Sequence, residues 1–253
     1  MKKIIKFIVR NIPRPVMILL SRFVFLLKPF YLGNVVECPI CGKHYRKFLP
    51  YGNKGESNRL CPHCLSLERH RLLWIYLKNK SNFFNKEANF LHFAPEQPFI
   101  KRFKNLKNLK YTTADIVSPI AILHIDIMDT KLKAESYDII FANHVLEHVP
   151  NDILAMKEIY RIMKANSWAI LQVPINYNAL KTDEDFSITD PKEREKRFGQ
   201  YDHVRYHGLD YPERLKQSGF DVEIFSVKEN FSNNEIKRYR LDSKECLYIA
   251  WKR

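Results

Sequence analysis

Four of the five cysteines form two Cys-x2-Cys pairs, Cys38 with Cys41 and Cys61 with Cys64. A turn of this kind directs two thiolates at one point, and two such turns complete a tetrahedral shell of four sulfurs around a metal. A closed shell has no position for water, so we expect a structural Zn²⁺ ion. Iron and disulfides are the alternatives. The lysine-rich chain shows no signal peptide, which favours a cytoplasmic location and reduced thiols.

A second set of polar residues follows short apolar runs later in the chain. Asp115 and Asp126 each follow such a run, and Asn143 and His144 end a third. Ligands of parallel sheets bind at the carboxyl ends of the strands. There Asp115 could accept from two ribose hydroxyls, and Asp126 could accept from an adenine amino group with Ile127 beside the base. Taken singly, each acid is better explained as a loop or capping residue, and it is their place at consecutive strand ends that indicates a binding site.

Histidines near these positions are candidates for a general base, because their pKa lies near neutrality. We expect His203 to take this role first, since Asp202 adjoins it, with His144 and His148 as further candidates. His148 could instead be a turn residue bonded to the backbone. The spacing His144-x-x-Glu147-His148 also places two histidines and a glutamate on one side of a helical turn, which would suit a second metal.

The cations are unevenly distributed. The net charge is 42 − 28 = +14, which indicates an anionic partner, and seven of the cations precede the first acid, Glu37. The apolar run 16–27 is too short to span a membrane. Residues 1–34 are therefore predicted to form a basic amphipathic segment. Through residues 1–30 it could contact an anionic membrane at the inner face, or it could pack as an ordinary helix.

Arginines later in the chain are candidates for binding an acceptor. Arg69 and Arg71 lie in a predicted helix after the second cysteine pair, for which Ser66 is the expected cap, and Arg205 follows Asp202 and His203. The alternative for the first two is a solvated helix face.

The elements that must position these residues alternate between strands and helices. A helix is expected over 151–164, capped by Asn151, and another from Asp210 to Gly219. This alternation predicts an α/β, Rossmann-like, seven-stranded and mostly parallel sheet with helices on both faces, after a small zinc-ribbon-like module. The expected strands are 90–93, 111–115, 120–125, 138–142, 168–173, 222–226 and 246–251. The predicted domains are 1–34, 35–77 for the module with its helix, and 88–253.

Residues 126–149, with Asp126 and the run Phe141-Ala142-Asn143-His144-Val145-Leu146-Glu147-His148, strongly resemble a signature of class I S-adenosylmethionine-dependent methyltransferases. The resemblance covers about residues 88–253 and implies S-adenosyl-L-methionine as cofactor. It also implies that Asp115 binds the ribose and Asp126 the adenine, and that Asn143 and His144 line the methyl-transfer site. The leading cysteine module and the Leu67–Arg71 segment look like a bacterial subgroup similar to methyltransferase type 11.

The loop after the first strand departs from the family pattern. Where the family has acid-x-Gly-x-Gly, this chain has His92-Phe93-Ala94-Pro95-Glu96. Phe93, Ala94, Pro95 and Glu96 are the corresponding cofactor-binding candidates. Pro95 removes a backbone donor and Glu96 adds a charge, while Glu96 could hold the cofactor's amino group or ribose. An inactive cofactor fold is the alternative.

The leading hypothesis is methyl transfer to an oxygen or nitrogen of a small polar acceptor, sugar-like, phosphorylated or a surface-glycan precursor. One alternative is a methyltransferase of ribosomal or other RNA that uses the zinc module to bind its substrate. Nucleic acid is the less favoured partner, because the N-terminal cations alternate with aliphatic residues. Another alternative is a non-catalytic zinc-ribbon binding protein.

Overall fold

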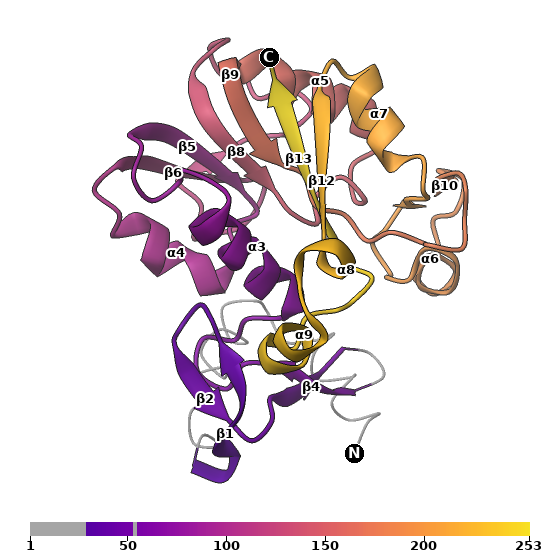
Figure 1. Cartoon of the computed structure of the whole chain (residues 1–253). Helices are drawn as coiled ribbons and strands as arrows, with labels where there is room; N and C mark the ends of the chain where they lie inside the picture. The colour runs from indigo at the N-terminus through magenta and orange to yellow at the C-terminus, as the bar shows by residue number, and fades with distance from the viewer. Residues whose placement is uncertain (1–28, 53–54) are drawn as a thin grey trace. The chain divides into compact units, whose positions relative to one another are not determined.

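The computed structural model describes residues 29–52 and 55–253 (Figure 1). The chain forms two compact units, one of residues up to Asn82 with Ser226–Glu245, the other of Phe83–Phe225 with Cys246–Arg253. The predicted boundaries at residues 34, 77 and 88 stay predictions. The proposed membrane contact falls on residues that, up to position 28, lie outside the described part. Among the described helices, none has the length and apolar character to cross a membrane.

The second unit contains the seven-stranded sheet that the sequence predicts. Its spatial order is β12-β13-β9-β8-β5-β6-β7. The pairs from β9 to β7 are parallel, whereas β13 runs antiparallel to β9, so the sheet is mixed. The third strand is shorter than expected. The strands are β5 (Ala88–Phe93), β6 (Leu109–Asp115), β7 (Leu123–His124), β8 (Tyr137–Ala142), β9 (Met163–Ile170), β12 (Asp221–Ser226) and β13 (Cys246–Lys252).

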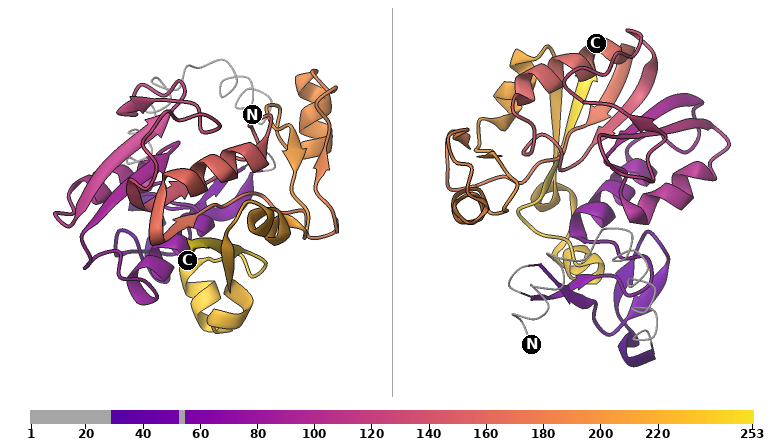
Figure 2. Two further views of the ribbon diagram at one scale, coloured as in Figure 1. Left: turned by 90° about the horizontal axis from the view of Figure 1, so that it is seen from above. Right: turned by 180° about the vertical axis from the view of Figure 1, so that it is seen from behind.

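The central strands are buried on both faces, which explains their nearly continuous apolar sequence. On one face, Phe90 packs edge-to-face against Phe141 with ring centroids 4.7 Å apart, and Phe103 of α4 (Gln97–Lys104) packs on Phe90. On the other face, Leu91 and Ile140 belong to the main apolar cluster. Helices therefore cover both faces of the sheet (Figures 1 and 2).

The cluster on the second face includes α5 (Asp152–Ile162) and α7 (Tyr211–Gln217). As predicted, Asn151 caps α5, its Oδ1 accepting from the Leu154 N–H at 2.9 Å. The segment between β9 and α7 adds α6 (Pro191–Phe198) and a short antiparallel pair, β10 (Asp183–Glu184) with β11 (Arg205–Tyr206). This segment carries His203 and Arg205.

In the first unit, the described residues form two antiparallel hairpins and three helices. The hairpins are β1 (Leu32–Cys38) with β2 (Lys43–Tyr45), and β3 (Leu49–Tyr51) with β4 (Glu56–Leu60). The helices are α3 (Glu68–Asn79), α8 (Val227–Asn230) and α9 (Asn233–Tyr239). Arg238 of α9 donates from Nε to Glu37 Oε2 of β1 at 2.7 Å, so the late segment 226–245 is part of this unit.

Candidate functional site

The carboxyl ends of four neighbouring parallel strands meet at one edge of the sheet. In the register, Phe93 of β5 lies opposite both Ala114 of β6 and Ala142 of β8, and Asp115 lies opposite His124 of β7. Ala94, Asp126 and Asn143 follow these strand ends directly or within two residues. The structure therefore brings the predicted cofactor residues to the edge where ligands of such sheets bind.

The loop after β5 makes the turn that glycine usually makes, but with alanine. Ala94 has φ +46°, in the left-handed region that costs a residue with a Cβ roughly 1 kcal/mol or more, and its N–H donates to Ala114 O at 2.8 Å. Pro95 and Glu96 then lead into α4, with Glu96 as the N-cap residue. The small side chain of Ala94 allows this bend at the position where the family pattern has its first glycine.

Glu96 and Asn143 join the ends of β5 and β8. Asn143 Nδ2 donates to Glu96 Oε2 at 2.8 Å, while Asn143 Oδ1 is buried and accepts no hydrogen bond within the described residues. Buried polar atoms are rarely left unpaired. An orphaned acceptor here fits a ligand donor such as the amino group of S-adenosylmethionine.

The two acids that follow β6 and β7 each hold their own loop. Asp115 Oδ1 accepts from the N–H groups of Val117 and Ser118 at 2.9 and 2.8 Å, and Asp126 Oδ1 accepts from Met128 N–H at 2.8 Å. In both carboxylates, Oδ2 has no hydrogen bond within the described residues, which leaves it available for a ligand. Ile127 is buried in the apolar cluster.

Beyond β8, His144 and Glu147 form a hydrogen-bonded pair. His144 has φ +54°, and its Nδ1 lies 3.2 Å from Glu147 Oε1. A carboxylate only accepts, so Nδ1 carries the proton and Nε2 keeps its lone pair. Burial alone would raise the pKa of Glu147, but the hydrogen bond from His144 and nearby imidazoles lower it to about 2. Glu147 is thus a buried carboxylate paired with His144.

His148 and His203, from distant parts of the sequence, meet beside this pair. Their ring centroids are 4.7 Å apart. His203 is buried and its Nδ1 lies 3.0 Å from Phe198 O, and burial lowers its pKa. Asp202 does not pair with His203: its backbone oxygen and Oδ2 lie 3.3 and 3.5 Å from His148 Nδ1. The neighbour that Asp202 orients is therefore His148.

Arg205 is buried and its donors are committed. Nη1 donates to Leu146 O and Val149 O, both at 2.6 Å, Nη2 donates to Pro150 O at 3.0 Å, and Nε donates to Glu184 Oε2 at 3.0 Å. These bonds fix the turn that presents Glu147 and His148. The geometry gives Arg205 a positioning role, in contrast to the expected contact with an acceptor.

The sequence reasoning did not identify Asp152, the centre of a second buried network. Asp152 accepts from His207 Nε2 at 3.2 Å and from Arg214 Nη2 at 2.7 Å, and Arg205 Nε lies 4.0 Å away. Burial opposes ionisation, yet these partners lower the pKa of Asp152. Asp152 is the first residue of α5. An acid at this position is common because it interacts favourably with the helix dipole, so the sequence carries no sign of the network.

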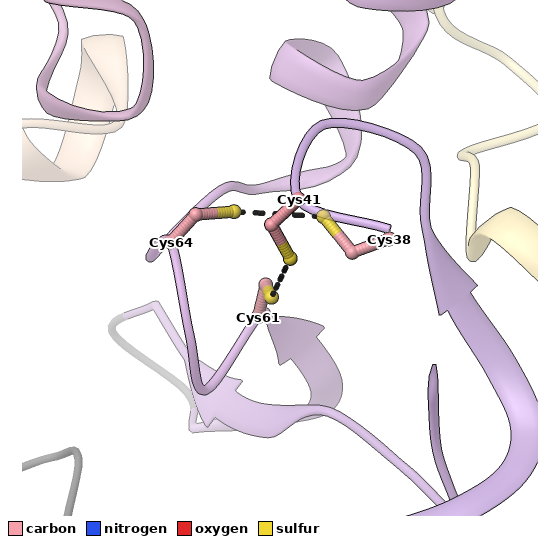
Figure 3. A group of neighbouring side chains, drawn as sticks. All are labelled: Cys38, Cys41, Cys61 and Cys64. Atoms are coloured by element: carbon pink, nitrogen blue, oxygen red, sulfur yellow. Dashed lines mark hydrogen bonds between the residues drawn. The ribbon is translucent and has the colours of Figure 1, made fainter. Parts of the chain in front are cut away.

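In the first unit, the four paired cysteines converge (Figure 3). Cys38 Sγ lies 3.5 Å from Cys64 Sγ, and Cys41 Sγ lies 3.8 Å from Cys61 Sγ. Sulfurs bound 2.3 Å from a tetrahedral metal are about 3.8 Å apart, so the donor set fits Zn²⁺. Both Cys-x2-Cys turns are closed by the same type of backbone hydrogen bond. Gly42 N–H donates to Cys38 O at 2.8 Å, and Leu65 N–H donates to Cys61 O at 3.0 Å.

Ser66 and Arg71 support this cluster. Ser66 does not cap α3, whose N-cap residue is Leu67; its Oγ lies 3.2 Å from the sulfurs of both Cys38 and Cys64. Arg71 is buried and donates to the backbone oxygens of four residues at 2.6–3.0 Å, in Arg59, Ser66, Tyr239 and Arg240. The expected acceptor contact of Arg71 thus gives way to a structural role, while Arg69 is half-buried on α3.

Comparison with known proteins identifies the second unit. Residues 83–171 match the protein family described as a methyltransferase domain. The unit is a class I S-adenosylmethionine-dependent methyltransferase domain. The protein is thus an enzyme, which decides against a non-catalytic zinc-ribbon protein. A search of curated proteins gave no match.

A solved structure supports the fold of this methyltransferase, and a second one shows similarity only. The [4+2]-cyclase SpnF has a TM-score of 0.54 at 11% sequence identity, covering 92% of this chain and 95% of that one. Phosphoethanolamine N-methyltransferase 2 of Haemonchus contortus has a TM-score of 0.45 at 13% identity, covering 68% and 50%. At such identities the likeness concerns the fold alone.

Proposed function

We propose that this methyltransferase acts on an oxygen or nitrogen of a small, polar, sugar-like acceptor bound beyond the end of β8, with His144 as general base. The observation that carries the proposal is the His144 ring. Its Nδ1 donates to the buried Glu147, and its Nε2 is buried without a hydrogen-bond partner in the described residues. An imidazole oriented by a carboxylate, with one free lone pair, can take a proton from an acceptor.

We further propose that S-adenosylmethionine binds along the strand ends. The Oδ2 atom of Asp115 would accept from the ribose, Asp126 would accept from the adenine, and Asn143 Oδ1 would accept from the amino group. When bound, the cofactor supplies a methyl group that is already activated as a sulfonium. The protein then has to align the acceptor and remove its proton.

His144 replaces His203 as the first candidate for the base. His203 is buried and bonded to Phe198 O, and burial lowers its pKa. His144 directly follows Asn143 at the carboxyl end of β8, and 26% of its side chain is exposed, whereas His203 is buried. The exposure of the ring and its place at the strand end therefore favour His144.

The arrangement of the arginines narrows the acceptor class. Arg71 and Arg205 donate to backbone oxygens and to Glu184, so neither supports a phosphorylated acceptor. The segment that carries His203 instead exposes aromatic rings, with Phe186 51% and Tyr201 49% accessible. Exposed rings beside polar groups suit the apolar face and hydroxyl edge of a sugar.

A substitution at His144 tests the proposal. Because His144 has a left-handed backbone, His144→Asn is the variant that the fold tolerates best. We expect the rate constant for methyl transfer to fall by at least ~100-fold, the usual effect of losing a general base. Affinity for S-adenosylhomocysteine should stay unchanged.

The assay follows the transfer of labelled methyl groups to free sugars, nucleotide sugars, sugar phosphates, amines and total RNA. The matched control is His44→Asn, at an exposed histidine of β2, which should behave as the unmodified protein. Normal turnover in His144→Asn would refute the base assignment. Transfer to RNA alone would refute the small acceptor.

We also propose that the four cysteines of the first unit hold a structural Zn²⁺ ion. The sulfur spacing supports the proposal, and a shell of four thiolates leaves no coordination position for a reactant.

A further inference from the structure

Only one oxygen of the buried Glu147 carboxylate has a hydrogen-bond partner within the described residues. Its side chain is 1% exposed, and its Oε1 pairs with His144 Nδ1 at 3.2 Å. Its second oxygen, Oε2, is buried and accepts no hydrogen bond from the described residues. No lysine or arginine of the described chain forms an ion pair with it. A buried acceptor is rarely left without a partner, so Oε2 is available to a ligand.

Two imidazoles, those of His148 and His203, lie close to this carboxylate. One ligand atom from each of Glu147, His148 and His203 lies within 4.8 Å of the others. Donors bound 2.0–2.2 Å from a tetrahedral metal are roughly 3.4 Å apart, so small side-chain rotations would bring these three into a shell. The carboxylate and imidazole types suit a divalent transition metal.

Contacts between Nδ1 and backbone oxygens orient the rings of His148 and His203 for metal binding. His203 Nδ1 lies 3.0 Å from Phe198 O, and His148 Nδ1 lies 3.3 Å from Asp202 O. A carbonyl oxygen only accepts, so each Nδ1 carries the proton and each Nε2 presents a lone pair. Metal-binding histidines are typically held in this way, with one ring nitrogen bonded to a carbonyl or carboxylate.

We infer that Glu147, His148 and His203 form a second metal site, for a divalent transition metal such as Zn²⁺. The ligand set differs from the one that the sequence suggests, because His144 bonds to Glu147 and His203, 55 residues after His148, supplies the third ligand. The site belongs to the methyltransferase unit and is separate from the four cysteines.

Three protein ligands leave a coordination position open, unlike four thiolates. An acceptor hydroxyl in that position would release its proton more readily to His144 Nε2, as a metal lowers the pKa of a bound hydroxyl. This role rests on the proposed function, whereas the binding of the metal does not.

Metal content tests the inference. The full-length protein, dialysed to equilibrium against micromolar zinc, is compared with His203→Ala and Glu147→Gln by elemental analysis. We expect each variant to bind one zinc equivalent fewer than the unmodified chain. This difference does not depend on how much zinc the four cysteines bind, because all the variants share them. Glu147→Gln keeps the shape of the side chain and an oxygen that accepts from His144. A loss of zinc in this variant is therefore not explained by misfolding.

His144→Asn serves as the matched control and should keep the full zinc content, because His144 is outside the ligand set. Equal zinc in the unmodified chain, His203→Ala and Glu147→Gln would overturn the inference. So would loss of an equivalent in His144→Asn alone. If no acceptor is ever methylated while the zinc difference persists, the proposed function fails and the metal site stands.

Discussion

Cys61→Ser is expected to abolish zinc binding at the cysteine cluster and to unfold the first unit. The hairpins around the cluster are short, with β2 and β3 of three residues each, and could not form a stable core on their own. Structural zinc sites contribute on the order of 10 kcal/mol to folding at neutral pH. Loss of one thiolate therefore removes the main source of stability of this unit.

The measurement combines elemental zinc analysis with limited proteolysis, which reports unfolding of each unit separately. Cys246→Ser is the control, because Cys246 lies at the start of β13 and outside the cluster. It should keep its zinc and its protease resistance. If Cys61→Ser also keeps both, the cluster is not a structural metal site.

Arg205→Met is expected to destabilise the methyltransferase unit by about 3–5 kcal/mol, as does removal of one partner from a buried charge network. Arg205 is fully buried, and its loss would leave three backbone oxygens of the turn after Leu146 without their donor and Glu184 with Arg214 alone. The free energy of unfolding, from denaturant titration, provides the readout.

Arg197→Met is the matched control for Arg205. Arg197 also pairs with two carboxylates, Asp183 and Asp185, both at 2.7 Å, but 41% of its side chain is exposed. Exposed ion pairs contribute little, so this variant should unfold near the midpoint of the unmodified protein. Equal losses in the two variants would show that burial of Arg205 is not what stabilises the turn.

The strand ends were predictable from the sequence because local patterns determine them. Each apolar run before Asp115, Asp126 and Asn143 is long enough to signal a strand, and parallel strands place their carboxyl ends together. The cysteine cluster was predictable for a similar reason, since each pair lies within one turn.

Other features depend on contacts between distant residues, which one sequence does not reveal. His203 meets Glu147 and His148 only after the segment beyond β9 has folded back. Arg71 and Arg205 are the residue type usually found at the surface, so their burial carries no local signal. The same holds for residues 226–245, which join the first unit although they separate two strands of the sheet.

The most direct test of the cofactor site is a calorimetric titration of Asp115→Asn with S-adenosylhomocysteine. In this variant Oδ1 can still accept from Val117 and Ser118, while an amide replaces Oδ2, the oxygen that we propose accepts from the ribose. The unmodified chain and the control Asp221→Asn, at the start of β12, should bind one equivalent. Asp115→Asn should bind at least ~10-fold more weakly, as expected for losing hydrogen bonds to a charged group. No binding by the unmodified protein, or equal affinity in Asp115→Asn, would contradict the account.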